Sequence, residues 1–235
     1  MKYLIVNADD FGASRGINRG IIQSHRVGIL TSASLMVNMP AAQEAVDLAG
    51  EMSSLSVGLH FTLTEENGTP SVALADSTVC QLRLAEQMNR FQSLTGQPPT
   101  HLDSHHNIHR HPRVLPLVLE IASQYGLPLR EHSPVRYFPD FYGQWDGETH
   151  LEQISIGNLK AMLASALHDE FTELSCHPGY TDSKWLSAYS LEREAELRTL
   201  CDPSLPEYLK GLGIALVNFR DFVTRPVPVE MSDRD

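Results

Sequence analysis

Short apolar runs that alternate with amphipathic stretches constrain the fold of this chain more than any other feature of its sequence. Residues 3–7 have the length and apolarity of a buried strand, and 17–25 follow with isoleucines on one helical face. Such alternation implies a mostly parallel sheet with right-handed crossovers. Further strands are predicted over 31–37, 55–63, 101–105, 127–131, 172–177 and 213–219, and further helices over 41–49, 80–94, 112–125, 151–168 and 191–200, with an aromatic-rich and proline-rich loop over 134–145.

The number of these units predicts the fold class, which is α/β. About seven strands favour a distorted (β/α) barrel similar to a TIM barrel, and an open doubly wound sheet is the alternative. The 235 residues contain no linker, internal repeat or low-complexity stretch, so we expect a single domain over 1–235.

Composition excludes several kinds of partner. The formal net charge of −11 and the lack of a Lys/Arg cluster argue against a nucleic-acid partner. Arg193 and Arg198 lie among Glu192, Glu194 and Glu196, a pattern typical of a solvated helix face. Three scattered cysteines form no disulfide framework, and the first apolar run is too short for a signal peptide or a membrane span. We therefore expect a cytoplasmic protein without a membrane partner.

Polar residues gather at the predicted carboxyl ends of four strands, where barrel enzymes place their chemistry. Asp9 and Asp10 follow the first strand, His60 lies late in the third, and His177 ends a later one. In the fourth, side-chain alternation puts residues 101, 103 and 105 on one face, which favours His105 over its neighbour 106 as a ligand.

Each of these residues also has an ordinary structural interpretation. Asp9 and Asp10 could cap the following helix, and an isolated buried histidine is more often a hydrogen-bonded core residue than a ligand. The histidine-rich run 105–111 could bind metal adventitiously. Convergence of two carboxylates and three histidines on one barrel mouth nevertheless favours a functional site.

An aspartate and two histidines are a ligand set that leaves coordination positions open for water and substrate. A divalent ion lowers the pKa of a bound water from 15.7 toward about 7. A second carboxylate can accept the proton of that water, and a further histidine can protonate a leaving amine. The set therefore suits hydrolysis of an amide or an ester.

Five motifs in order along the chain resemble the YdjC-like carbohydrate deacetylases, a family that includes chito-oligosaccharide deacetylases and hopanoid-pathway relatives. The resemblance spans most of the chain, and the motifs are specific only jointly. They are Asn7-Ala8-Asp9-Asp10-Phe11-Gly12, Thr31-Ser32-Ala33-Ser34-Leu35-Met36-Val37-Asn38, Gly58-Leu59-His60-Phe61-Thr62-Leu63-Thr64, Thr100-His101-Leu102-Asp103-Ser104-His105-His106 and Cys176-His177-Pro178.

The resemblance implies a distorted barrel and one divalent metal ion held by Asp10, His60 and His105. Analogy with polysaccharide deacetylases implies that Asp9 is the catalytic base and His177 the acid. Magnesium or zinc is the expected metal, with nickel, cobalt or manganese also compatible with these ligands. The expected reaction is removal of acetyl groups from N-acetylated sugars of the chito-oligosaccharide type.

Two further residues are candidates for substrate contact. Arg130 matches a recurring arginine of the family that could orient a carboxylate or bind substrate. Tyr142 belongs to the aromatic loop, whose rings could either stack on sugars or simply pack. The segment between Thr64 and Thr100 is shorter than in chito-oligosaccharide enzymes, which leaves the sugar and its chain length open.

Two other functions remain as alternatives. One is a non-catalytic sugar-binding or metal-binding protein on the same scaffold, although such a module needs neither acid nor base. The other is an iron oxygenase with two histidines and one carboxylate, which usually adopts a β-jelly roll. The oligomeric state is open, and a homodimer is possible in principle.

Overall fold

A parallel sheet built around the first strand carries the fold, and the computed structural model describes residues 2–167, 171–182 and 187–224. The order across the sheet is β4-β3-β2-β1-β8-β5. In addition, β9 pairs with the first residues of β1, and β2 pairs with the last residues of β1. All of these pairings are parallel. The strands are β1 (Lys2–Phe11), β2 (Ser32–Leu35), β3 (Ser56–Phe61), β4 (Leu102–Ser104), β5 (Arg136–Phe138), β8 (Phe171–Cys176) and β9 (Ile214–Leu216).

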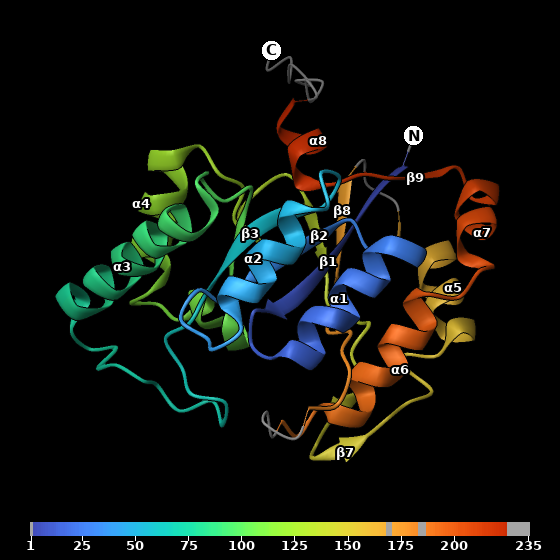
Figure 1. The fold of residues 1–235 in the computed structure, drawn as a ribbon, viewed down its shortest axis with the longest axis horizontal. Helices are drawn as coiled ribbons and strands as arrows, with labels where there is room; N and C mark the ends of the chain where they lie inside the picture. Colours follow the sequence, from blue (N-terminus) through green and yellow to red (C-terminus); the bar gives the residue numbers. More distant parts are fainter. Residues whose placement is uncertain (1, 168–170, 183–186, 225–235) are drawn as a thin grey trace, which may run out of the picture.

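Helices form the outer layer of the molecule. Figure 1 shows α1 and α2 side by side in front of the central strands, with α3 and α4 on one flank and α5, α6 and α7 on the other. The helices are α1 (Arg15–Val27), α2 (Ala42–Gly50), α3 (Ser77–Thr95), α4 (Leu115–Tyr125), α5 (Ile156–Ala166), α6 (Ser190–Leu200), α7 (Leu205–Gly211) and α8 (Phe219–Thr224), with a 3-10 helix η1 (His105–Arg110).

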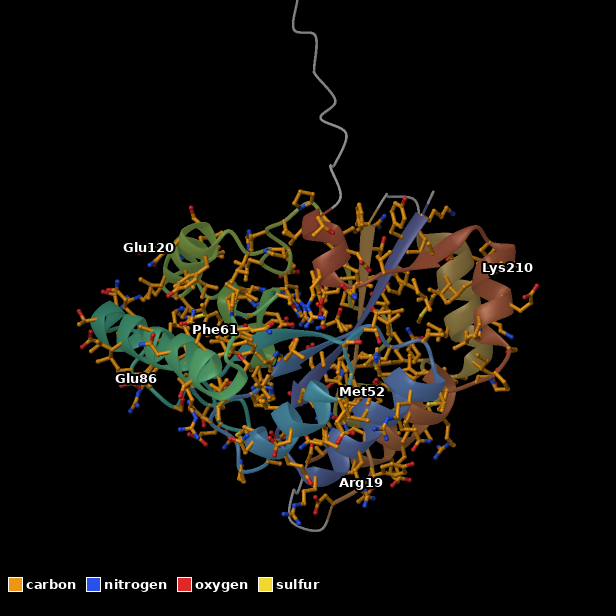
Figure 2. All side chains as sticks on the ribbon, turned by 45° about the horizontal axis from the view of Figure 1, so that its top comes forward. Arg19, Met52, Phe61, Glu86, Glu120 and Lys210 are labelled. Atoms are coloured by element: carbon orange, nitrogen blue, oxygen red, sulfur yellow. The ribbon has the colours of Figure 1, made fainter. Side chains whose placement is uncertain are left out.

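Side-chain burial follows these two layers. In Figure 2, Glu86 of α3, Glu120 of α4 and Lys210 of α7 lie at the outer surface, whereas Phe61 of β3 is fully buried. Residues 4–11 of β1 are all buried, as expected for a strand covered on both faces. No helix within 2–167, 171–182 and 187–224 combines the length and the apolarity that crossing a bilayer requires.

The sheet is strongly curled. β1 and β4 are separated by β2 and β3, so a flat sheet would hold them about 14 Å apart. Asn7 Nδ2 on β1 nevertheless lies only 3.2 Å from Asp103 Oδ2 on β4. The sheet is therefore a half-barrel whose inner side brings strand ends together. This single α/β domain confirms the predicted fold class and strand number, and it is not the jelly roll of the oxygenase alternative.

Several predicted boundaries were wrong, chiefly after β4. Residues 127–131 form only one bridge, between Leu129 and Leu102, and the strand that pairs with β8 is β5, inside the predicted loop 134–145. That loop also contains β6 (Gln144–Trp145), which pairs with β7 (Glu148–Thr149). α4 begins after Pro112, at Leu115, and α5 begins at Ile156, with the end predicted at His168 outside the described residues. α7 and α8 were not predicted.

Candidate active site

Asp9 and Asp10 both point into the site because the end of β1 departs from regular strand geometry. Adjacent residues of a regular strand face opposite sides. Asp10 has φ +64°, and the pairing of β1 with β2 shifts register between Ala8 and Phe11. A left-handed aspartate is uncommon and is found where surrounding structure holds it in place. Both carboxylates are buried, so this irregularity serves the site rather than a surface turn.

His60 is oriented by the neighbouring strand. His60 on β3 lies opposite Asp103 on β4, and its Nδ1 is 2.8 Å from Asp103 Oδ1. This contact leaves His60 Nε2 directed at Asp10 Oδ1, 3.4 Å away. A carboxylate on one imidazole nitrogen fixes the tautomer that presents the other nitrogen to a metal. Asp103 lies on the strand face predicted for it, but its sequence context indicated no role.

His105 reaches the same carboxylate oxygen from beyond β4. The strand ends at Ser104, and His105 begins the 3-10 helix, with Nδ1 3.0 Å from Asp10 Oδ1. Its Nε2 lies 3.6 Å from Glu66 Oε2. His106 has φ +52° and is exposed, with its Nδ1 3.0 Å from Thr64 Oγ1. The structure thus brings His105, and not His106, to Asp10.

The charge of this cluster favours a bound cation. One ligand atom from each of Asp10, His60 and His105 lies within 4.8 Å of the others, and all three residues are buried. Burial lowers the pKa of His60, but Asp103 and Asp9 outweigh it and raise the pKa to about 10. Burial also lowers the pKa of His105, but the Asp10 carboxylate outweighs this effect and raises the pKa to about 9. Positive charge is therefore favoured at this point, which protons or a divalent ion can supply.

Unpartnered atoms in the cluster support the same interpretation. Among the described residues, Asp10 Oδ1 and His105 Nε2 are buried side-chain atoms without a well-formed hydrogen bond. Such atoms are rare in folded proteins, and coordination of a metal ion is one way to satisfy them. An oxygen and two imidazole nitrogens suit several divalent metals. The residues present therefore fit a resident metal ion.

Arg130 connects the carboxylates on the inner side of the barrel. It donates to both oxygens of Asp9 at 2.8 and 2.7 Å and to Glu173 Oε1 at 3.0 and 2.7 Å, and it lies 2.9 Å from Asp103. Its side chain is 1% exposed. Arg130 therefore orients carboxylates. Burial raises the pKa of Glu173 to about 7 although Arg130 opposes the rise. Glu173 lies within a predicted strand, and nothing in the sequence indicated a functional role for it.

His177 follows β8 on the opposite side of the cluster. Its Nε2 lies 3.8 Å from Asp9 Oδ2, and its backbone N–H donates to Glu196. The imidazole is only partly buried, so one side remains open to the pocket. Burial lowers the pKa of His177 to about 4, against the opposite effect of the nearby carboxylates. His177 and Asp9 are thus neighbours at the edge of the cluster.

The helix face over 192–196 was predicted to be solvated, and this prediction was wrong. Glu192, Arg193 and Glu196 are buried, whereas Arg198 is exposed. Arg193 donates to Asp10 Oδ2 at 2.5 Å. Glu196 accepts a hydrogen bond from the hydroxyl of Tyr189, and burial raises its pKa to about 8. Charged residues that alternate in sign are typical of a solvent-exposed helix, and only the fold shows that one face of α6 lies against the site.

A pocket of about 150 Å³ opens over the cluster. Tyr142 stands at its wall with its ring centroid 5.6 Å from that of His177, and it stacks on Tyr189 at 4.6 Å. Tyr142 is 39% exposed, which leaves part of its ring available to a ligand. The described lining residues are Asp10, Glu66, His105, His106, Tyr142, Gln144, His177, Ser187, Ala188, Tyr189 and Arg193.

Fold and site together define an α/β half-barrel protein with a buried carboxylate–imidazole centre at the carboxyl ends of its strands, able to hold a divalent metal. The chain belongs to the YdjC-like protein family, whose family model matches residues 3–211. The family resemblance of the five sequence motifs is thereby confirmed.

Comparison with individual proteins agrees with this assignment. The chain is 39% identical to a carbohydrate deacetylase of Geobacillus stearothermophilus, over 94% of this chain and 98% of that protein. It is 36% identical to a chitooligosaccharide deacetylase of Serratia marcescens, over 94% and 99%. A solved structure from Enterococcus faecalis, assigned to cellobiose-phosphate cleavage, superposes with a TM-score of 0.81 at 26% identity, over 94% and 98%.

Proposed function

We propose that this protein removes acetyl groups from N-acetylated sugars of the chito-oligosaccharide type, with a divalent metal held by Asp10, His60 and His105. The observation that carries the proposal is the convergence of these three buried side chains on one point, where Asp10 Oδ1 has no well-formed hydrogen bond within the described ranges. The names of the relatives at 39% and 36% identity supply the substrate class.

The metal, magnesium or zinc by our expectation, would supply Lewis acidity and lower the pKa of a bound water toward about 7. Asp10 Oδ1 and His60 Nε2 would contribute to holding it. Asp103 keeps the His60 ring in place, and Arg193 keeps the Asp10 carboxylate in place. The protein thus prepares the site before substrate arrives, so little reorganisation accompanies the reaction.

We assign Asp9 as the proton acceptor and His177 as the proton donor to the leaving amine. Their facing atoms, Oδ2 and Nε2, lie 3.8 Å apart at the edge of the cluster. Arg130 holds Asp9 through both carboxylate oxygens, which fixes the direction in which it can accept a proton. A positioned acid or base contributes roughly 10²–10⁴ in rate. Arg130 acts here as a positioning residue rather than as a substrate contact.

The decisive experiment is metal analysis of the purified protein followed by acetate-release assays. Mono-, di- and trisaccharides of N-acetylglucosamine serve as substrates, before and after chelation and with magnesium or zinc restored. We expect release that depends on the restored metal. Sugar binding without release from any member of the panel would instead favour the non-catalytic alternative. Cytoplasmic location stays a prediction from the sequence.

A further inference from the structure

The β6–β7 hairpin presents an aromatic ring beside the pocket of the candidate active site. Two residues, Asp146 and Gly147, connect the strands, with φ of +54° and +77°. Positive φ at both positions is the signature of a type I′ turn, which matches the twist of a hairpin. Gly143 N donates to Tyr189 Oη at 2.7 Å, and Thr149 Oγ1 donates to Glu192. The hairpin is therefore fixed to α6.

Trp145 on this hairpin has one covered face and one open face. The ring of His150 lies parallel to it, with centroids 3.6 Å apart and an interplanar angle of 1°. Trp145 is nevertheless 44% exposed. The stack on His150 holds the Trp145 ring in one orientation and leaves the other face of the ring open. The ring therefore offers a flat apolar surface at low entropic cost.

The other aromatics of this segment do not share this arrangement. Phe141 is fully buried and Phe138 is 9% exposed, so both belong to the core. Tyr137 lies over the guanidinium of Arg130, with a distance of 4.8 Å from its ring centroid. The sequence left packing and sugar stacking open for the whole loop. The structure divides it into core rings and two exposed rings, Trp145 and Tyr142.

A groove of about 400 Å³ runs along these exposed rings toward α5. Its volume lies within the range of roughly 300–1,000 Å³ typical of small-molecule sites. Tyr142 and Gln144 line both this groove and the pocket over the cluster, so the two lie next to each other. The described lining residues are Phe138, Pro139, Asp140, Tyr142, Gln144, Trp145, Gln153, Asn158, Met162 and Ser165.

The remaining lining suits a polyhydroxylated ligand. Asp140 is exposed, and the carboxamides of Gln153 and Asn158 are held by local hydrogen bonds, from Gln153 Nε2 to Asp140 O at 2.9 Å and from Asn158 Nδ2 to Gln153 O at 2.8 Å. A pyranose ring combines an apolar C–H face with hydroxyls at its rim, and aromatic surfaces flanked by amides and a carboxylate complement both. The groove on the other flank, of about 370 Å³, has no Phe, Tyr or Trp among its described lining residues.

We propose that the groove beside Trp145 binds the pyranose ring next to the acetylated sugar, so that the protein recognises an oligosaccharide rather than a single sugar. This inference rests on the proposed function for the class of ligand. It assigns Trp145 and Tyr142 as the residues that determine preference for chain length. The acetylated ring itself occupies the pocket over the cluster.

Binding measured without turnover tests this inference separately from catalysis. The chain has two tryptophans, Trp145 and Trp185, so a Trp185→Phe variant reports on Trp145 alone. The full-length variant, treated with a chelator so that substrate is not consumed, is titrated with N-acetylglucosamine and with its trisaccharide. We expect a saturable change in Trp145 emission with the trisaccharide and little change with the monosaccharide.

Calorimetric titration of the protein with native tryptophans gives the energetic test. Trp145→Ala should weaken binding of the trisaccharide by about three- to tenfold and leave binding of the monosaccharide unchanged. Trp145→Phe should restore most of the affinity because it keeps an aromatic face. Tyr125→Ala, which removes a comparably exposed ring (38%) at the end of α4, is the matched control and should change neither affinity.

Two results would overturn the inference: equal affinity of Trp145→Ala and the parent for the trisaccharide, or no binding of any oligosaccharide in the panel. Failure of the proposed function gives a different pattern. In that case no acetate is released with any metal, yet the trisaccharide still changes Trp145 emission. The two ideas can therefore fail separately.

Discussion

Arg193 and Asp10 form a buried ion pair across the mouth of the half-barrel, with Nη2 2.5 Å from Oδ2 and side-chain exposures of 6% and 4%. This ion pair gives the two oxygens of the Asp10 carboxylate different partners. Oδ2 is held by Arg193, so only Oδ1 faces the two imidazoles of His60 and His105. The pKa of Asp10 is held well below its usual range despite burial, because Arg193 and His105 favour the charged form.

Replacing Arg193 should destabilise the protein far more than replacing its neighbour on the same helix. Arg193→Met leaves Asp10 Oδ2 buried without its cation, and breaking such a pair typically costs about 3–5 kcal/mol. Arg198→Met removes an exposed guanidinium, and substitutions of that kind usually stay within about 0.5 kcal/mol. Urea unfolding of the chelated proteins measures both. Equal midpoints would show that the ion pair contributes nothing to the fold.

His105 and the adjacent His106 should differ sharply in metal binding. His105→Ala removes an imidazole that lies 3.0 Å from Asp10 Oδ1, whereas His106→Ala removes an exposed ring. We expect the first variant to lose bound metal and at least about 100-fold in acetate release, and the second to keep metal and most activity. Metal analysis and circular dichroism on both proteins check the result. Retained activity in a folded His105→Ala protein with confirmed loss of metal would remove the assignment.

Asp103 should influence metal affinity without touching the metal. Asp103→Asn weakens the contact with His60 Nδ1 at 2.8 Å that orients the ring. Loss of such a partner typically lowers metal affinity about 10–100-fold. Competition with a chromogenic chelator measures the change. Asp140→Asn, which removes an exposed carboxylate away from the cluster, is the control and should leave the affinity unaltered.

His177 should affect rate and not metal content. Its Nε2 faces Asp9, and it does not belong to the group of three side chains that converge on Asp10 Oδ1. We expect His177→Ala to retain metal and lose roughly 10²–10⁴ in kcat, as the removal of a general acid or base does. Loss of metal from this variant would indicate instead that His177 is a ligand.

Much of the fold could be predicted from the sequence because its signals are local, and the resemblance of five motifs to a known family singled out Asp10, His60 and His105. Alternating strand and helix patterns predict a parallel sheet, and strand carboxyl ends in such a sheet share one edge. Asp10 and His60 are the second-last residues of β1 and β3, and His105 directly follows β4. The architecture brings these strand ends together, and the irregular end of β1 and the contact of His60 with Asp103 orient the side chains.

The rest of the site depends on contacts between residues far apart in the sequence. Arg130 contacts Asp9, which lies 121 residues away in the sequence, and Arg193 contacts Asp10, which lies 183 residues away. No periodicity within α6 distinguishes a buried arginine from a solvated one when its neighbours are glutamates. β5 was missed for a related reason, since its three residues, Arg136–Phe138, become a strand only by pairing with β8. The stretch 127–131 contains Pro128 and Glu131, which are disfavoured in strands, and it makes only one bridge.

His101 should make stability depend on pH. It is buried, stacks on Phe219 at 3.8 Å, and its Nε2 lies 3.0 Å from Ser34 Oγ. Burial, aided by Arg130 and His60, lowers its pKa from 6.5 to about 4, although the carboxylates of Asp103 and Asp9 oppose the change. Between these values the unfolded chain binds a proton that the folded protein does not. The free energy of unfolding therefore falls as pH is lowered from about 6.5 to 4.

Removal of the titrating ring isolates this contribution from those of the other histidines. His101→Gln should be less stable than the parent at pH 7, because it loses the stack on Phe219. The stability gap should then narrow steadily from about pH 6.5 down to 4, since only the parent loses the favourable neutral histidine on acidification. Urea unfolding of both chelated proteins at half-unit pH steps measures this gap. A gap that stays constant across the range would mean that His101 titrates alike in the folded and unfolded chains.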